Sequence, residues 1–245
     1  QIFCAGFDLY GQVSGPSKPR PVMPGRTTVE LPQGEDGWSM ISAGSDHSCG
    51  ITSTRNLYCW GRDHLGQMGG NREPVDRLHL PRRLRCEQDA DDRFKAVAAG
   101  KLATVGLTTL NEVCIWTEDT YLSGHGGNPF PKNSEGRFLL KPESFVDFDP
   151  TNDDFEEISL GLKHVCIRSN SGRLYCWGRN RDNVIPDLED IAILATEDDD
   201  IPMAFSAAHA VAAGRDHTCI LHGVTTSSIT CVGKNTDAQL GTSMM

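Results

Sequence analysis

Long apolar runs are missing from this sequence. No stretch approaches the roughly 18 consecutive apolar residues that a membrane-spanning helix needs, and the most apolar window, Met203–Gly214, contains Ser206 and His209. We therefore expect no direct membrane span. The chain starts at Gln1 without an initiator methionine or a signal-peptide pattern, so we expect a leader to be absent or already removed.

Basic residues are also scarce. The chain has 23 Lys and Arg against 33 Asp and Glu, a formal net charge of -10. Its densest basic cluster, Arg82–Arg85, is followed by Glu87, Asp89, Asp91 and Asp92. Because a protein that binds nucleic-acid phosphates normally carries a basic stripe, we expect no nucleic-acid partner. Other proteins, or a larger assembly, are the expected partners.

Catalytic signatures are absent too. The sequence contains no Gly-x-Ser-x-Gly, no His-Glu-x-x-His and no phosphate-binding loop. Asp46-His47-Ser48 and Asp216-His217-Thr218 place triad-type residues side by side, but a triad requires adjacency in space rather than in sequence. We therefore predict that the chain is not an enzyme and needs no cofactor.

What the chain does contain is a repeat. Residues 158–178, ISLGLKHVCIRSNSGRLYCWG, recur in similar form at 41–61 and at 211–233. With the second cysteine of each unit as a marker (Cys4, Cys59, Cys114, Cys176 and Cys231), the steps are 55, 55, 62 and 55 residues. A period near 55 is typical of propeller blades rather than helical solenoids, and no long helical stripe with caps is present. The sequence therefore predicts an all-β repeat fold.

Each repeat is predicted to contain a β-hairpin. In 41–61, Gly50 should face Tyr58 and Ile51 should face Leu57, which leaves 53–55 as a turn without glycine and therefore with some strain or a bulge. In 158–178 the equivalent turn, 170–172, contains Gly172, which can adopt the left-handed conformation. The 211–233 hairpin has a longer tip at 223–227.

The nine cysteines indicate the redox state of the compartment in which the protein works. Three pairs fall at matching places in the hairpins: Cys49 with Cys59, Cys166 with Cys176, and Cys219 with Cys231. The predicted register sets the two members of a pair opposite each other, so disulfides are favoured over reduced core thiols. Their spacing does not suit zinc. We therefore expect an extracellular or other oxidising compartment (secreted, lumenal or intermembrane space), although no Asn-x-Ser/Thr sequon supports secretion.

The copy that begins near Gly100 departs from this pattern. It has Ala103 in the place of the repeat histidine and Val105 in the place of the first cysteine. Cys114 is then either a buried thiol or bonded elsewhere, and Cys86 is the nearest candidate in sequence. Cys4 could pair with a missing N-terminal segment or with another chain. The joint loss of histidine and cysteine suggests that both belong to one structural device.

The order of motifs resembles the regulator of chromosome condensation repeat family. The shared elements are small-small-Gly-x-x-His-x-Cys, a hairpin, Cys-[Trp/Val]-Gly, and a Gly-Gln-Leu-Gly-like tail at 66–69 and 239–241. The resemblance implies a β-propeller of four-stranded blades, usually seven, of which this chain holds about four and a half to five. The paired cysteines look more like secreted relatives, such as the ectodomains of crinkly-type receptor kinases, than like the nuclear exchange factor. We expect a partial seven-blade ring or a smaller ring.

Three suggestive residue types each have a structural and a functional interpretation. The histidines His47, His164 and His217 could line a metal site, but a hydrogen bond from each to a neighbouring backbone carbonyl is favoured. Trp60, Trp116 and Trp177 could stack on sugars, but packing between blades is favoured. The carboxylates Asp147, Asp149, Asp153 and Asp154 lack the spacing of a calcium loop. Structural roles are also expected for the repeat glycines Gly44, Gly61, Gly161, Gly178, Gly214 and Gly233.

These features predict a single β-propeller domain over residues 1–245, with repeat units at approximately 1–37 (partial), 38–93, 94–155, 156–207 and 208–245. The leading functional hypothesis is a non-catalytic protein–protein interaction or assembly module supported by disulfides. One alternative is a carbohydrate-binding or hydrolytic propeller. The other is an intracellular adaptor or GTPase regulator. The variable connections between hairpins are the expected binding surfaces.

Overall fold

The fold is described from a computed structural model of the chain. The described residues are 2–6, 8–13, 23–69, 78–87, 91–118, 122, 124–125, 128–129, 132, 138–145, 148–178 and 207–241. They contain β-strands and one short 3₁₀ helix, with no α-helix among them. The chain divides into two compact units, one of residues 1–118 and 132–139 and the other of residues 119–131 and 140–245. The single domain predicted from the sequence stays a prediction.

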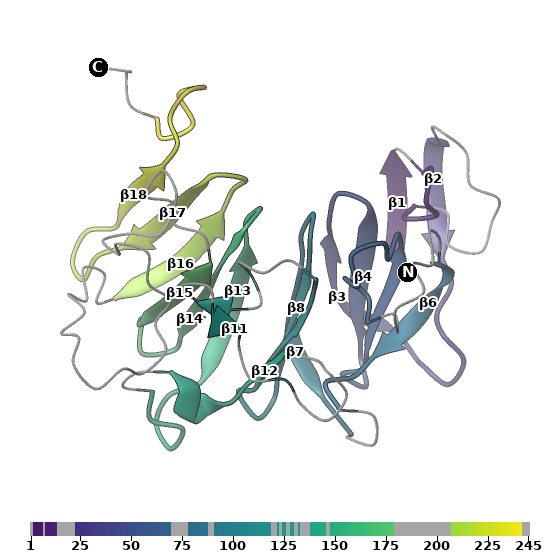
Figure 1. The fold of residues 1–245 in the computed structure, drawn as a ribbon, viewed down its shortest axis with the longest axis horizontal. Coiled ribbons are helices and arrows are strands. Elements are labelled where there is room, and N and C mark those ends of the chain that lie inside the picture. Colours follow the sequence, from purple (N-terminus) through teal and green to yellow (C-terminus); the bar gives the residue numbers. More distant parts are fainter. Residues whose placement is uncertain are drawn as a thin grey trace. The chain divides into compact units, whose positions relative to one another are not determined.

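The first unit contains three antiparallel sheets (Figure 1). A two-stranded sheet pairs β1 (Ile2–Gly6) with β2 (Met23–Val29). A four-stranded sheet has the order β3 (Trp38–Ala43), β4 (His47–Thr52), β5 (Leu57–Gly61) and β6 (Leu78–Leu84). A second four-stranded sheet runs β7 (Phe94–Ala99), β8 (Thr104–Thr108), β9 (Val113–Trp116) and β12 (Phe138–Leu140).

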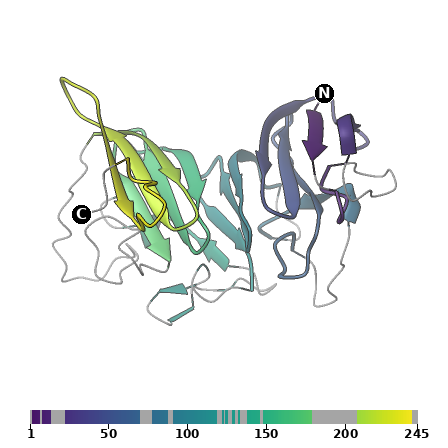
Figure 2. The ribbon, with the colours of Figure 1, turned by 90° about the horizontal axis from the view of Figure 1, so that it is seen from above.

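The second unit contains two three-stranded sheets, which lie face to face (Figure 2). Their strands are β13 (Phe155–Leu160), β14 (His164–Ser169) and β15 (Leu174–Gly178), followed by β16 (Ala208–Ala213), β17 (His217–His222) and β18 (Ser228–Gly233). A short ribbon of β10 (Gly124–His125) and β11 (Asn128–Pro129) and the 3₁₀ helix Pro142–Ser144 precede them. Every larger sheet thus begins with three antiparallel strands joined by short turns.

The hairpin register agrees with the prediction. Gly50 lies opposite Tyr58 and Ile51 opposite Leu57, while the amide N–H of Thr52 donates to the Asn56 carbonyl at 2.9 Å. The turn without glycine is closed by Arg55, whose φ of 66° is in the left-handed region. In the later hairpin the same place is taken by Gly172, with a φ of 81°. A non-glycine residue in this conformation carries a steric cost, as the sequence predicted.

The hairpin β8–β9 corrects the alignment made from the cysteines. Val105 lies opposite Ile115, whereas Cys114 lies opposite Gly106. Ile115 therefore occupies the place of Cys59, and Cys114 occupies that of Tyr58. Because successive side chains of a strand point to opposite faces, this offset of one residue turns the Cys114 side chain away from the face that carries the other hairpin bridges. Cys114 is bonded instead to Cys86.

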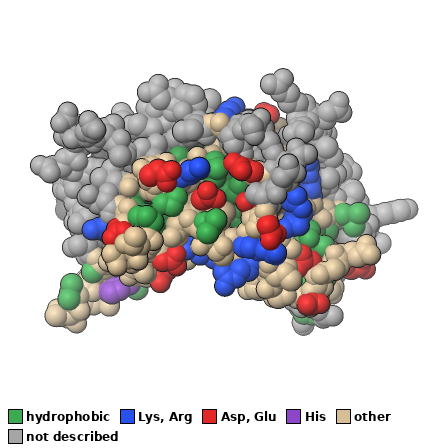
Figure 3. All heavy atoms as spheres, turned by 90° about the horizontal axis from the view of Figure 1, so that it is seen from below, with side chains coloured by type: hydrophobic (Ala, Val, Ile, Leu, Met, Phe, Trp, Pro, Cys, Tyr) green, Lys and Arg blue, Asp and Glu red, His purple; other side chains and the backbone are tan. Residues whose placement is uncertain are grey.

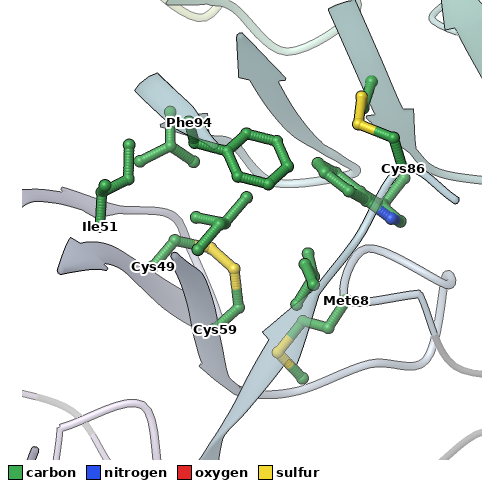
Figure 4. Packing of buried hydrophobic residues seen from close by; sticks show 11 residues of the cluster. Cys49, Ile51, Cys59, Met68, Cys86 and Phe94 are labelled. Atoms are coloured by element: carbon green, nitrogen blue, oxygen red, sulfur yellow. A yellow bond between two sulfur atoms is a disulfide. The ribbon is translucent and has the colours of Figure 1, made fainter. Parts of the chain in front are cut away.

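The main core of the first unit lies between its two four-stranded sheets (Figure 4). Its buried residues are Cys49, Ile51, Leu57, Cys59, Met68, Leu84, Cys86, Phe94, Val97, Cys114 and Trp116. The equivalent core of the second unit contains Cys166 and Cys176 from one sheet and Ala208, Val211 and Ile220 from the next. In both units the hairpin bridge therefore lies on the face that is turned toward the following sheet. We call this the trailing face of a sheet.

Candidate functional site

The repeat histidine joins one sheet to the next. His47 Nε2 and Thr104 Oγ1 share a hydrogen bond of 2.8 Å, and His164 Nε2 and Thr218 Oγ1 share one of the same length. Each threonine directly follows the position of the histidine in its own repeat. The expected partner, a backbone carbonyl, was wrong: the partner is a side-chain hydroxyl of the neighbouring sheet.

Burial controls the charge of these histidines. His47 and His164 are buried. Burial lowers the pKa of His47 to about 4, with a smaller contribution from His64. Burial also lowers the pKa of His164 to about 4, although Asp216 opposes the shift. Both rings are therefore neutral near pH 7, because desolvation in the protein core disfavours the charged imidazolium.

A metal site is not assembled from these rings. Within the described part of the chain, no group of three or more His, Cys, Asp or Glu side chains is placed to hold a metal ion.

The neighbouring Ser48 donates from its hydroxyl to the Gln12 carbonyl at 3.1 Å, so its side chain is directed away from His47 Nε2, which bonds Thr104. The sequential Asp-His-Ser therefore does not form a triad here.

Further contacts between sheets repeat in the same way. The Ser42 hydroxyl accepts from the Ala99 amide at 2.9 Å, and the Ser159 hydroxyl accepts from the Ala213 amide at 2.7 Å. The amide of Ser45 donates to the carbonyl of Gly100 at 3.2 Å. These contacts are made by a serine, a histidine and a backbone amide on the inner strands of a sheet. We call this set of contacts between neighbouring sheets the latch. The sequence analysis missed the serine and threonine members, although both recur at fixed places in the repeat.

The repeat glycines make room for this latch. A Cβ atom on Gly44 would lie 2.3 Å from the Gly100 carbonyl oxygen, and one on Gly161 would lie 2.2 Å from the ring of His164. At the exit strands, Gly61, Gly178 and Gly233 have φ values of 113°, 116° and 113°, which L side chains rarely adopt. Gly44 and Gly161 therefore permit the close approach of neighbouring groups, whereas the glycines of the exit strands permit a backbone with positive φ.

The repeat that contains β7 to β9 lacks the latch groups. Ala98 stands in the place of Ser42, and Ala103 in the place of His47. Alanine has no polar side-chain group, so neither position can form the hydrogen bonds of the latch.

The structure contains four disulfides: Cys49–Cys59, Cys166–Cys176, Cys219–Cys231 and Cys86–Cys114. The first three are the predicted hairpin pairs, and the fourth decides between the alternatives that the sequence left open for Cys114. Cys4 is a free thiol, and burial, with a smaller effect of Asp8, raises its pKa. The three hairpin bridges join paired strands, whereas Cys86–Cys114 joins the segment after β6 to β9 of the next sheet.

The repeat tryptophans are buried. Trp60, Trp116 and Trp177 are at most 2% exposed. The indole N–H of Trp60 donates to the Gln12 carbonyl at 3.0 Å, and that of Trp177 donates to the Leu122 carbonyl at 3.3 Å. A ring that is enclosed in this way cannot stack on a sugar from solvent.

The carboxylates of Asp149 and Asp153 in the acidic loop at 149–154 have hydrogen-bond or ion-pair partners within the protein. Asp149 accepts from Thr151 and Asn152, and these hydrogen bonds lower its pKa. Asp153 pairs with Arg173 at 3.1 Å. Asp147 lies outside the described residues. Among the described carboxylates, that of Asp149 thus stabilises a turn and that of Asp153 forms an ion pair.

Charges of both signs are interspersed on the described surface, as Figure 3 shows for one face. Asp91 pairs with Arg93 at 2.8 Å and with Arg83 at 3.8 Å. The Asp92 carboxylate accepts from the Cys86 amide. The basic cluster is thus partly neutralised by the acidic residues that follow it. Among the described residues, no helical segment is long and apolar enough to cross a membrane.

Comparison with known proteins identifies the repeat to which these hairpins belong. The model of the Regulator of chromosome condensation (RCC1) repeat matches residues 41–67 and 155–183. These residues include two of the hairpins with histidine, bridge and Trp-Gly described above. The chain thus contains two RCC1 repeats. Its fold is an all-β, RCC1-like β-propeller fold, and the β7–β9 and β16–β18 sheets are two further copies that the repeat model does not match.

The chain is similar in sequence to a mouse protein and in fold to two proteins with solved structures. The secretion-regulating guanine nucleotide exchange factor of Mus musculus is 35% identical over 79 residues, or 32% of this chain and 16% of the relative. Human WBSCR16 is similar in fold, with a TM-score of 0.70, 20% identity and coverage of 91% of this chain and 53% of that one. Prp20p from Saccharomyces cerevisiae has a TM-score of 0.68, 17% identity and coverage of 98% and 55%. The chain thus spans about half of each of these two solved proteins and 16% of the mouse protein.

Proposed function

We propose that this RCC1-like chain is a non-catalytic module that binds other proteins through its hairpin tips and connections. The observation that carries the proposal is the exposure of apolar residues at the tips. Leu110 on the β8–β9 turn is 72% exposed, and Val224 on the β17–β18 turn is 89% exposed. The histidines, tryptophans and paired cysteines of the described repeats are largely used in packing. Apolar side chains held in solvent on a rigid scaffold suit contact with a protein partner.

Site-specific photo-crosslinking tests this function. A photoreactive amino acid would be placed at Leu110, at Val224 and, as a control, at the exposed Glu30. In extract from the native source, the tip positions should give the same discrete protein adduct, and excess unlabelled chain should remove it. The Glu30 control should give none. The proposal would be contradicted if neither tip position gave an adduct, or if Glu30 gave the same adduct in equal yield.

We further propose that the module works in an oxidising compartment. The support is that eight cysteines are paired in four disulfides, and such bridges persist in oxidising surroundings. Thiols would be trapped with an alkylating reagent in intact cells before lysis, and labelled cysteines would be counted by mass spectrometry. Labelling of the chain at one cysteine supports the proposal, whereas labelling at all nine would favour an intracellular protein.

A second candidate is regulation of a small GTPase. It is favoured by the name of the mouse relative, which is a secretion-regulating guanine nucleotide exchange factor. The test is release of a fluorescent guanine nucleotide from a panel of small GTPases in the presence of the chain. Release that is accelerated for one GTPase and reduced by Leu110→Asp or Val224→Asp would favour this candidate. The carbohydrate-binding alternative has less support, because the repeat tryptophans are enclosed.

A further inference from the structure

Two neighbouring hairpin tips of the first unit are tied together through one dipeptide. The amide of Phe94 donates to the carbonyl of Arg55 on the β4–β5 turn at 2.8 Å. The amide of Thr109 on the β8–β9 turn donates to the carbonyl of Arg93 at 2.7 Å. The exposed side chain of Leu110 on the second turn is therefore held beside the tip of the preceding hairpin.

Three basic side chains reach these tips from the adjoining strands and connection. The guanidinium groups of Arg83 and Arg93 both donate to Oδ1 of Asn56, which follows the β4–β5 turn. The ammonium group of Lys95 donates to Oδ1 of Asn111 on the β8–β9 turn at 2.6 Å. Both acceptors are neutral amides, so these hydrogen bonds fix the positions of the three cations without cancelling their charge.

Arg55 adds a fourth cation at the tips. Its side chain is exposed, and no described group pairs with its guanidinium. The carboxylates at the same tips are those of Asp91, Glu35 and Glu112. Glu35 takes its hydrogen bonds from neutral side chains of the β4–β5 hairpin rather than from a guanidinium. The two tips thus keep a positive excess in a chain whose formal net charge is -10.

The second unit joins its tips without these arginines. There the amide of Ala208 donates to the carbonyl of Gly172 at 2.9 Å, which is the equivalent of the bond to the Arg55 carbonyl. Ala207 stands in the place of Arg93. Because the backbone contact forms equally with glycine and alanine, the repeat itself does not require the two guanidinium groups.

Asp91 covers part of the cationic surface from within the chain. Its carboxylate pairs with Arg93 at 2.8 Å and with Arg83 at 3.8 Å, while its side chain is 74% exposed. An ion pair with this exposure contributes little to stability. A carboxylate from another molecule can therefore take the place of Asp91 at the two guanidinium groups.

We infer that these two tips are a docking surface for an acidic peptide segment of a partner protein. One apolar residue of the segment packs on Leu110, and its carboxylates pair with the surrounding cations. A guanidinium group can bind a carboxylate through two parallel hydrogen bonds, which suits Arg55 and Arg93 to this partner. The inference rests on the proposed protein-binding function and names the chemistry of the partner, with Asp91 as an internal competitor.

Fluorescence anisotropy with a synthetic peptide tests the inference. The probe is a short labelled peptide of Asp and Glu residues with one central Leu. It should bind the full chain, and raised salt should weaken the binding because the ion pairs are exposed. Replacement of the acidic residues by Asn and Gln, or of the central Leu by Ser, should weaken binding by about fivefold or more. Equally tight binding of a single-stranded oligonucleotide would reveal a general polyanion site and would overturn the inference.

Variants of the chain assign the peptide to the two tips. Arg55→Gly should weaken binding by about twofold to fivefold, and misfolding cannot explain this loss because glycine suits the conformation of that turn position. Asp91→Asn should tighten binding by a similar factor, because it removes the internal competitor. Leu110→Ala should weaken binding by about threefold or more. Leu80→Ala is the matched control, because Leu80 is exposed on β6 away from the tips. Binding that is insensitive to Arg55→Gly and Leu110→Ala, or that weakens in Asp91→Asn, would overturn the inference.

The photo-crosslinking experiment separates this inference from the proposed function. Excess acidic peptide should remove the adduct that forms at Leu110 in native extract. An adduct that persists in the presence of the peptide would overturn the acidic assignment and leave the protein-binding function standing. Peptide binding with the expected variant pattern, but without an adduct at either tip, would support the docking chemistry and contradict the proposed function.

Discussion

Cys114 lies opposite Gly106 in the β8–β9 ladder, one place away from the position that cysteine occupies in the other hairpins. Val105 and Ile115 hold those two places and are directly opposite each other. The double variant Val105→Cys/Ile115→Cys should therefore form a fifth disulfide while Cys86–Cys114 stays intact. Peptide mapping under non-reducing conditions checks this.

A single variant serves as the control for that register. Val105→Cys alone should leave its new thiol unpaired, because Cys114 faces the other side of the sheet. Exchange of partners, with Cys86 released as a free thiol, would contradict the ladder described here.

The native thiol count follows from the same bridges. Of nine cysteines, eight are paired, which leaves Cys4 as the single free thiol. Denaturation without reductant, followed by alkylation, should label one residue. Loss of Cys86–Cys114 by Cys86→Ser/Cys114→Ser should cost about 3 kcal/mol of the free energy of unfolding, because the bridge closes a loop with a sequence separation of 28. Chemical denaturation measures this cost.

The sequence predicted the hairpins because two signals coincide there. Cysteine pairs and turn residues are both local, so the register of 41–61 and 158–178 could be derived from spacing alone. The β8–β9 hairpin lacks a cysteine pair, so the only marker, Cys114, gave an alignment that was wrong by one residue. The Trp-Gly and Trp-Thr pairs at Trp60 and Trp116 would have given the correct one.

The latch was less accessible to sequence analysis. Ser42 and Thr104 are small polar residues of a common type, and their role depends on a neighbouring sheet 57 residues away in sequence. Nothing in the local pattern states which strand will pack on which. The histidine was recognised because it recurs, whereas its acceptor could be identified only from the packing of sheets.

Acid should destabilise the protein through the buried histidines. His47 and His164 have a pKa of about 4 in the folded chain, below the ordinary value of 6.5. Between these values the unfolded chain binds more protons, so stability rises with pH, is complete above about pH 6.5 and is lost toward pH 4. Each histidine contributes on the order of 3 kcal/mol to this change. The melting temperature measured from pH 7.5 to 4 should fall accordingly.

Variants of the latch sharpen that pH prediction. His47→Gln should remove about half of the pH dependence of Tm between pH 6.5 and 4, because His164 keeps its own share, and it should cost some stability at neutral pH. Leu110→Gln is the control, because Leu110 is exposed and carries no titrating group, and it should leave the pH profile unchanged. An unchanged profile in His47→Gln would show that the acid transition has another origin.

Close approach at the glycines predicts a second class of destabilising variants. Gly44→Ala would place a Cβ 2.3 Å from the Gly100 carbonyl oxygen, so the neighbouring sheet must shift. We expect a loss of about 1–3 kcal/mol in the free energy of unfolding. Gly37→Ala is the control, because its nearest neighbour would be Ser53 Oγ at 3.8 Å. Equal stability of the two variants, measured by urea denaturation, would argue against sheet contact at Gly44.

The strained turn predicts a stabilising variant. Arg55 has a φ of 66° and an exposed side chain, while its carbonyl accepts from the Phe94 amide at 2.8 Å. Arg55→Gly relieves the steric cost of the left-handed conformation and keeps this backbone bond, so the free energy of unfolding should rise by up to about 1 kcal/mol. Ser53→Gly in the same turn has no such strain to relieve and should be neutral or destabilising. Thermal denaturation of the two variants distinguishes them, and stabilisation by Ser53→Gly alone would contradict the assignment of strain to Arg55.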